Sequence, residues 1–110
     1  DGRVTYLTEG HLRLSQRAVA DRQLPELAGR TPRSYTRAAA RPMPVGTPTR
    51  VRFDLLPTSA VLRAGHRLRV AIAGHDEGQF APVPANATPT YTVHHSRTHP
   101  SSLSLPIGQP

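Results

Sequence analysis

The chain has 110 residues, a formal net charge of +7 and no cysteine. This length is enough for one small domain, and the lack of cysteine excludes disulfides, thiolate metal sites and a cysteine nucleophile. Glycine (8) and proline (12) are frequent enough to exclude long helices and to favour short strands joined by turns. Because no apolar run is long enough to cross a membrane, we expect no membrane partner.

The positive charge comes from arginine alone, since the 14 basic residues include no lysine. Arginine is well suited to contact phosphate groups, so nucleic-acid binding is one interpretation. The arginines are spread along the chain, however, and few aromatic residues lie between them to stack on bases. We therefore expect a solvated, arginine-rich surface and no nucleic-acid partner.

The first part of the chain, residues 3–17, predicts two short strands. Residues 4–7 (VTYL) are rich in strand-forming types, and Glu9-Gly10 indicates a break or a bulge. Residues 11–17 (HLRLSQR) alternate between polar and apolar side chains, which is the period of a half-buried strand.

The next part, residues 18–48, predicts a long irregular crossover between two sheets. It holds five prolines, and the stretch from Arg17 to Leu27 has poor apolar spacing for anything beyond a helical turn. Residues 38–40 are three helix-favouring alanines. The Arg41-Pro42 pair that follows them disfavours continuation of a helix.

The last part, residues 49–107, carries the clearest strand pattern. Residues 49–55 and 68–73 alternate, and residues 90–94 and 102–107 predict two further strands. Residues 63–66 predict a turn in which Gly65 takes a positive φ, and residues 74–88 a polar loop. We expect Arg50, Arg52 and Arg69 to be exposed, and a buried core made of Val51, Phe53, Leu55, Leu68, Val70, Ile72, Val93, Leu103 and Leu105.

These elements together predict an all-β fold, an antiparallel sandwich or barrel. The sequence contains none of the Gly-x-Ser-x-Gly elbows that expose the nucleophile of an α/β serine hydrolase. We therefore predict no catalytic residue, and interpret the serines as surface and turn residues: Ser15, Ser34, Ser59, Ser96, Ser101, Ser102 and Ser104. A Ser-His-Asp triad scattered along the chain stays open.

Two groups of residues resemble metal ligands. His94, His95 and His99 lie close in sequence, but neighbouring side chains on a strand point to opposite faces, so His94 and His95 are poorly placed for one ion. Residues 75–77 (His-Asp-Glu) offer three ligand types in a loop, which is weak evidence alone. We expect no metal and no cofactor. Residues 86–88 (NAT) fit a glycosylation sequon, a short pattern that Pro89 makes an improbable site of modification.

Several motifs resemble one family in its own order along nearly the whole chain. These are residues 8–13 (TEGHLR), 44–48 (PVGTP), 52–59 (RFDLLPTS), 64–74 (AGHRLRVAIAG), 92–94 (TVH) and 99–106 (HPSSLSLP). They resemble the C-terminal domain of X-Pro dipeptidyl-peptidases, cocaine esterases and NonD-type (CocE/NonD) serine hydrolases. The resemblance implies an antiparallel jelly-roll β-sandwich of the galactose-binding-like type.

The resemblance also implies a role and a partner. The chain is expected to be the C-terminal part, about the second half, of one accessory sandwich, with residues 18–48 as its crossover. It begins at Asp1 rather than Met, which suggests part of a longer protein. An upstream α/β-hydrolase domain would carry the Ser-His-Asp triad that cleaves ester or acyl-peptide bonds, and homo-oligomer formation is left open.

Other interpretations stay open at this point. A stand-alone carbohydrate-binding sandwich is the alternative function, although the chain has no Trp to stack on a sugar. For the pair His66 and Arg67 we expect His66 to close the turn and Arg67 to bind a carboxylate or carbonyl group, with substrate contact as the alternative. Fold analogy alone does not establish a function.

Overall fold

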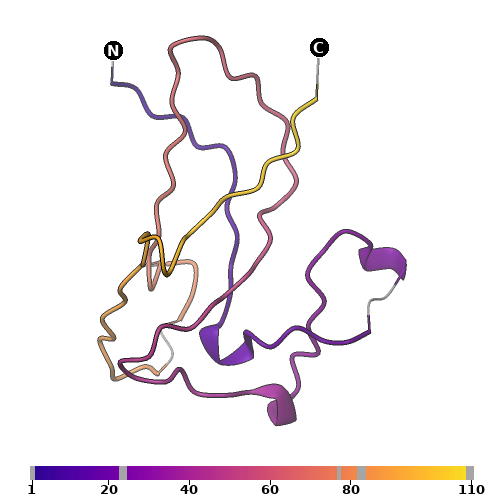
Figure 1. Ribbon diagram of the computed structural model, residues 1–110, viewed down its shortest axis with the longest axis vertical. Helices are drawn as coiled ribbons and strands as arrows, with labels where there is room; N and C mark the ends of the chain where they lie inside the picture. The colour runs from indigo at the N-terminus through magenta and orange to yellow at the C-terminus, as the bar shows by residue number, and fades with distance from the viewer. Residues whose placement is uncertain (1, 23–24, 77, 82–83, 109–110) are drawn as a thin grey trace. The chain divides into compact units, whose positions relative to one another are not determined.

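The computed structural model describes residues 2–22, 25–76, 78–81 and 84–108. It divides into two units, Asp1–Arg63 and Ala64–Pro110. Three one-turn 3₁₀-helices are formed in the first unit: η1 (Leu14–Gln16), η2 (Pro25–Leu27) and η3 (Arg37–Ala39). The rest of the described chain is turns and irregular coil, with no strand (Figure 1). The all-β sandwich is therefore still a prediction.

The helix η3 ends where the sequence predicts it must. Thr36 precedes the helix in an extended conformation, and its hydroxyl accepts a hydrogen bond from the Ala39 N–H at 3.3 Å. This is the bond that a threonine N-cap makes to a free N–H of the first turn. The helix stops before Arg41-Pro42, because the residue before a proline is disfavoured in helical conformation.

The helix η1 corrects the strand predicted over residues 11–17. The Gln16 N–H donates to the Arg13 carbonyl at 2.8 Å, which closes a turn in the middle of that segment. Within the same turn, the Ser15 carbonyl accepts a hydrogen bond from the Arg41 N–H at 2.8 Å. These backbone groups bind within a turn and to the crossover, so the alternating pattern did not produce a strand here.

Two distant segments of the first unit run side by side. The Leu56 N–H donates to the Glu9 carbonyl at 2.8 Å, and the Thr8 hydroxyl donates to the Leu56 carbonyl at 2.7 Å. A Cβ added to Gly10 would lie only 2.5 Å from the Asp54 carbonyl oxygen. Numbering rises on one segment as it falls on the other, so the two are antiparallel. Gly10 is needed for the close approach that the pairing makes.

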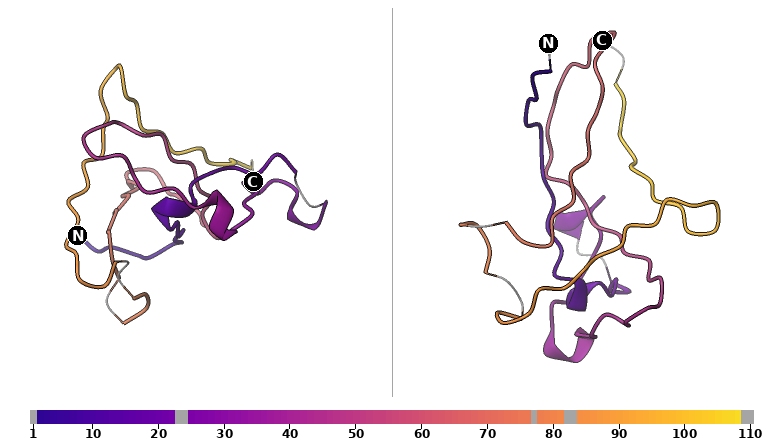
Figure 2. Two further views of the ribbon diagram at one scale, coloured as in Figure 1. Left: turned by 90° about the horizontal axis from the view of Figure 1, so that it is seen from below. Right: turned by 90° about the vertical axis from the view of Figure 1, so that its left-hand side faces the viewer.

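The second unit contains the predicted glycine turn. Gly65 has a φ of +84° at the turn formed with Ala64, which confirms the conformation expected from the sequence. Further along, the ring of Tyr91 covers Gly74, since a Cβ at Gly74 would lie 2.5 Å from Tyr91 Cε2. The segments on either side of the 75–90 loop therefore lie next to each other. Figure 2 shows the same coil from two further directions.

The predicted core is wrong for the structure as described. No hydrophobic side chain among the described residues is buried; Val51 is half-buried, and Phe53, Leu68 and Val70 are 41%, 45% and 64% exposed. The other members of the set, Leu55, Ile72, Val93, Leu103 and Leu105, are exposed as well. The physical reason is that an apolar row is buried only when a second layer covers it, and the described residues form no sheet to supply one. The predicted exposure of Arg50, Arg52 and Arg69 is confirmed.

Candidate functional site

Arg33 is a half-buried side chain that joins the crossover to two other segments. Its Nη1 donates to the carbonyls of Gln16, Arg17 and Ala18, at 3.2, 2.5 and 3.3 Å. Its Nη2 donates to the carbonyl of Arg52. A guanidinium has five N–H donors in a planar fork, which allows one side chain to satisfy several carbonyls at once. The charge of Arg33 is thus used for structure rather than held free for a ligand.

Asp54 is held by Thr31 of the crossover. The Thr31 N–H donates to Asp54 Oδ2 at 2.5 Å, and the Thr31 hydroxyl donates to Oδ1 at 2.9 Å. The backbone hydrogen bond from Thr31 lowers the pKa of Asp54 below its usual value, against some desolvation. The Thr31 hydroxyl and the charges of Arg52 and Arg33 lower the pKa further. Asp54 is therefore a carboxylate kept charged by its neighbours and poorly suited to act as a general base.

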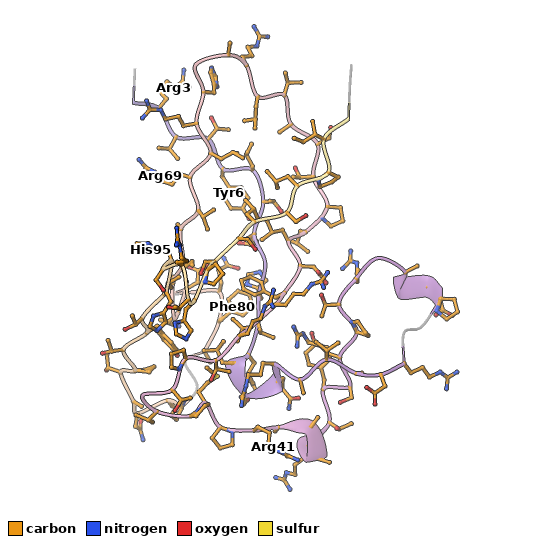
Figure 3. All side chains as sticks on the ribbon, viewed as in Figure 1. Arg3, Tyr6, Arg41, Arg69, Phe80 and His95 are labelled. Atoms are coloured by element: carbon orange, nitrogen blue, oxygen red, sulfur yellow. The ribbon has the colours of Figure 1, made fainter. Side chains whose placement is uncertain are left out.

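Arg17 and Arg41 form a second set of contacts that fixes the end of η3. Arg17 Nη1 donates to the Leu14 and Arg41 carbonyls at 3.2 and 2.7 Å, and its Nη2 to the Pro42 carbonyl at 3.2 Å. Arg41 Nη1 donates to the carbonyls of Ala38 and Ala40 at 2.7 and 2.9 Å, beside η3 (Figure 3). The Ala38 and Ala40 carbonyls lie at the end of η3, where carbonyls lack partners within the helix.

Three serine hydroxyls bind backbone groups or other hydroxyl groups. Ser34 Oγ lies 3.3 Å from Thr36 Oγ1, Ser96 Oγ accepts from the His99 N–H at 3.1 Å, and Ser101 Oγ donates to the His94 carbonyl. A hydrolytic serine instead needs its hydroxyl against a base such as an imidazole ring. The contacts of these three serines are those of turn residues, as the sequence predicts.

Two of the three histidines that lie close in sequence also lie close in the structure. The rings of His94 and His99 lie together, with centroids 5.4 Å apart and planes inclined by 48°. Both belong to the loop of residues 94–101, which also carries His95 (Figure 3). No group of three or more His, Asp or Glu suited to a metal ion is found among the described residues. Glu77 of the His75-Asp76-Glu77 group lies outside them.

The protein surface has two shallow hollows, one in each unit. A hollow of about 270 Å³ in the first unit is lined by Val19, Gly29, Arg30, Thr31, Pro32 and Arg52. One of about 370 Å³ in the second unit is lined by His75, Gly78, Gln79, Phe80 and Ala81. Neither brings together a nucleophile, a base and an oxyanion donor, which are the parts that acyl transfer requires.

The remaining predicted residues are readily placed. His66 and Arg67 directly follow the Ala64–Gly65 turn, and both are exposed. Neither residue forms a hydrogen bond or an ion pair with another described residue. The expected closing contact of His66 and the expected pairing of Arg67 are therefore not observed. Asn86 of the sequon lies in a turn in which the Ala87 N–H donates to the Pro84 carbonyl at 3.3 Å. Among the described residues, no helix is long and apolar enough to span a membrane.

Sequence reasoning missed the contacts that hold the first unit together. Local periodicity places Thr31 and Arg33 only in the crossover. Their partners lie 15 to 23 residues away, and periodicity carries no information at that range. The one sequence signal for these contacts was the large number of arginines, because a partly buried arginine needs several hydrogen-bond acceptors.

The comparison with protein families decides what kind of chain this is. Residues 1–104 match the model of the X-Pro dipeptidyl-peptidase C-terminal non-catalytic domain. The chain belongs to this family. The resemblance predicted from the sequence motifs is thereby confirmed, and the description of the domain as non-catalytic agrees with the lack of a nucleophile elbow in the sequence.

Two curated relatives place this C-terminal domain in a longer context. Each is named "Putative serine esterase", one from Mycobacterium bovis and one from Mycobacterium tuberculosis. Both are 44% identical to this chain over 109 residues, which is 99% of the chain. The chain spans only 17% of the length of these relatives. No solved structure matches the chain significantly.

Proposed function

We propose that this chain is the accessory, non-catalytic β-sandwich of a CocE/NonD-type α/β serine hydrolase, resembling X-Pro dipeptidyl-peptidases, that cleaves ester or acyl-peptide bonds. The observation that carries the proposal is the family match over residues 1–104 to a C-terminal domain described as non-catalytic. The relatives' names favour esters as the substrate class. The reaction would proceed through an acyl-enzyme on a serine of the upstream domain.

The local geometry supports a sheet-based fold. The antiparallel contact between Glu9 and Leu56 has the direction of two neighbouring strands in a sheet. Tyr91 lies over Gly74, and an aromatic side chain over a neighbouring glycine is a device that stabilises sheets. The Gly65 turn separates the two alternating segments 49–55 and 68–73 as a connection between strands would.

The exposed apolar rows support the proposal that another part of the same protein covers them. Alternating residues of segments 68–72 and 103–105 leave Leu68, Val70, Ile72, Leu103 and Leu105 between 43% and 64% exposed. Monomeric proteins rarely leave adjoining apolar surface of this kind uncovered. We infer that the remaining strands of the sandwich and the hydrolase core cover these rows, which is how the accessory domain would support the catalytic one.

A matched pair of substitutions tests this assignment in the full-length hydrolase. Val70→Asp introduces a charge into an apolar row, whereas Val45→Asp makes the same change at a valine that is 99% exposed in a turn. We expect Val70→Asp to lower the thermal midpoint and the yield of active enzyme, because a charge would be buried without a partner. Val45→Asp should leave both unchanged.

The assay is turnover of nitrophenyl esters and of X-Pro nitroanilides, with and without a serine-directed fluorophosphonate. We expect ester or X-Pro amide turnover that the reagent abolishes. A full-length protein that turns over neither class, or whose turnover the reagent leaves intact, contradicts the proposal. If Val70→Asp and Val45→Asp had equal effects, the proposal that the apolar rows are covered would be contradicted, but the hydrolase assignment would not.

A further inference from the structure

The loop of residues 94–101 is held in one shape by its own hydrogen bonds. Ser101 Oγ donates to the His94 carbonyl, which ties the two ends of the loop together. At its tip, the His99 N–H donates to Ser96 Oγ at 3.1 Å, and Ser96 Oγ lies 3.2 Å from Thr98 Oγ1. These bonds hold the loop backbone at His94 and His99, from which the two imidazole side chains extend.

The rings of His94 and His99 form a pair of exposed imidazoles. The His94 and His99 ring centroids are 5.4 Å apart and the ring planes are inclined by 48°. Two imidazoles bound to one tetrahedral ion, with metal–nitrogen bonds of about 2.0–2.1 Å, have centroids roughly 5 Å apart. The observed separation is therefore close to that of a two-histidine chelate.

The environment of His99 favours one ring nitrogen as the ligand. Thr98 Oγ1 lies 3.2 Å from His99 Nδ1. When Nδ1 carries the proton and donates to this hydroxyl, Nε2 keeps its lone pair and is free to bind a metal. Histidines that bind metals usually hold their second nitrogen in such a hydrogen bond, which fixes the tautomer and the ring orientation.

We propose that His94 and His99 form a metal site for a divalent ion that prefers nitrogen ligands, of the Zn²⁺ and Cu²⁺ class. Neutral imidazole suits these ions, whereas Mg²⁺ and Ca²⁺ require oxygen ligands that this loop does not supply as carboxylates. Two protein ligands leave the other positions of the ion to water, so the site is an open one. The proposal does not depend on the hydrolase assignment.

In this site, only two of the three histidines that lie close in sequence bind the metal ion. The ring contact joins His94 and His99. His95 is the direct neighbour of His94 and serves as a built-in control, because it carries the same side chain in the same loop. Arg97, also in the loop, adds positive charge near the ion and limits the affinity.

The test is a titration of the full-length protein with Zn²⁺, followed by calorimetry and by the ¹⁵N–¹H spectrum of histidine-labelled protein. We expect saturation at one equivalent and a shift of the His99 Nε2 signal. His94→Ala and His99→Ala should each weaken binding by about tenfold or more, and Thr98→Val by roughly tenfold through the loss of its bond to Nδ1. His95→Ala should bind as the original chain does, and Mg²⁺ should not compete.

Backbone amide spectra of each variant show whether the rest of the chain is unchanged, so a loss of binding is assigned to the ligand and not to unfolding. Equal weakening by His95→Ala and His99→Ala would overturn the site, as would full binding by the His94→Ala/His99→Ala double variant. A Zn²⁺ titration that shifts no signal of either ring would also overturn it.

Discussion

Asp54 binds Thr31 through both carboxylate oxygens, with the Thr31 N–H 2.5 Å from Oδ2 and the Thr31 hydroxyl 2.9 Å from Oδ1. The two residues are 23 positions apart, so this pair fastens the crossover to the segment of residues 52–56. Arg33 donates to the Arg52 carbonyl in the same segment. Together the two contacts hold the crossover against a part of the chain that the sequence predicts to be a strand.

The first prediction concerns the Asp54–Thr31 pair. Asp54→Asn should release the Thr31 amide, because the amide side chain lacks the charge and one of the two acceptor oxygens. We expect faster hydrogen exchange at Thr31 and a loss of about 1 kcal/mol or less, since hydrogen bonds to an exposed carboxylate contribute little. Thr31→Val, which removes only the hydroxyl bond, should have the smaller effect. Unchanged exchange at Thr31 in Asp54→Asn would contradict the contact.

The second prediction is a pH dependence of the same pair. Because the pKa of Asp54 is lowered in the structure, its contribution to stability is fully present above the ordinary pKa of 3.8 and is lost as pH falls through the lower folded value. The chemical shift of the Thr31 amide should therefore titrate with a midpoint below 3.8 and stay flat between pH 5 and 7. A midpoint above 3.8 would contradict it.

The third prediction ranks three glycines. Gly10→Ala places a methyl group 2.5 Å from the Asp54 carbonyl oxygen, so backbone must move, at a cost of about 1–3 kcal/mol. Gly74→Ala meets only the Tyr91 side chain, which can rotate, and Gly108→Ala meets nothing within 4 Å. The rate of limited proteolysis should rise most for Gly10→Ala and least for Gly108→Ala. The reverse order would show that residues 8–10 and 54–56 do not lie together.

The fourth prediction concerns the register of these segments in the proposed sheet. If Glu9 and Leu56 are a hydrogen-bonded pair, Leu12 and Phe53 face each other as a non-hydrogen-bonded pair with Cα atoms about 4.5 Å apart. That distance permits a disulfide. Since the chain has no cysteine, Leu12→Cys/Phe53→Cys should oxidise to an intramolecular bridge. Leu12→Cys/Arg52→Cys, the one-residue slip, should not; preferential bridging of this slipped pair would rule out the register.

The fifth prediction concerns the isolated chain. With no buried hydrophobic side chain among the described residues, the apolar rows offer their surface to other molecules. We expect the 110-residue chain to self-associate or to unfold with little cooperativity. Sedimentation combined with thermal unfolding measures both properties. A monodisperse monomer that melts cooperatively above about 65 °C would show that the chain completes its own core.

What the sequence predicted correctly is local. The positive φ of Gly65 and the end of η3 before Arg41-Pro42 follow from steric rules that act over one or two residues. The family was also predictable, because its motifs are contiguous strings such as residues 52–59.

What the sequence could not predict depends on distant partners. The alternation at Val51 and Phe53 indicates one apolar face, but burial depends on a second layer that no local pattern supplies. The approach of His94 to His99 depends on the loop bonds of Ser96 and Ser101, which bend a segment that alternation would have kept straight. The sequence argument found His94 and His95 poorly placed for one ion, but it carried no information on the approach of His94 to His99.

We propose that catalysis belongs to a part of the protein outside these 110 residues. The direct measurement is to label the full-length protein with a serine-directed fluorophosphonate and to locate the modified serine by mass spectrometry. We expect one modified serine, lying outside this chain in a Gly-x-Ser-x-Gly sequence, and no labelling of the 110-residue chain alone. Stoichiometric modification of any serine of this chain, such as Ser101, would contradict the account.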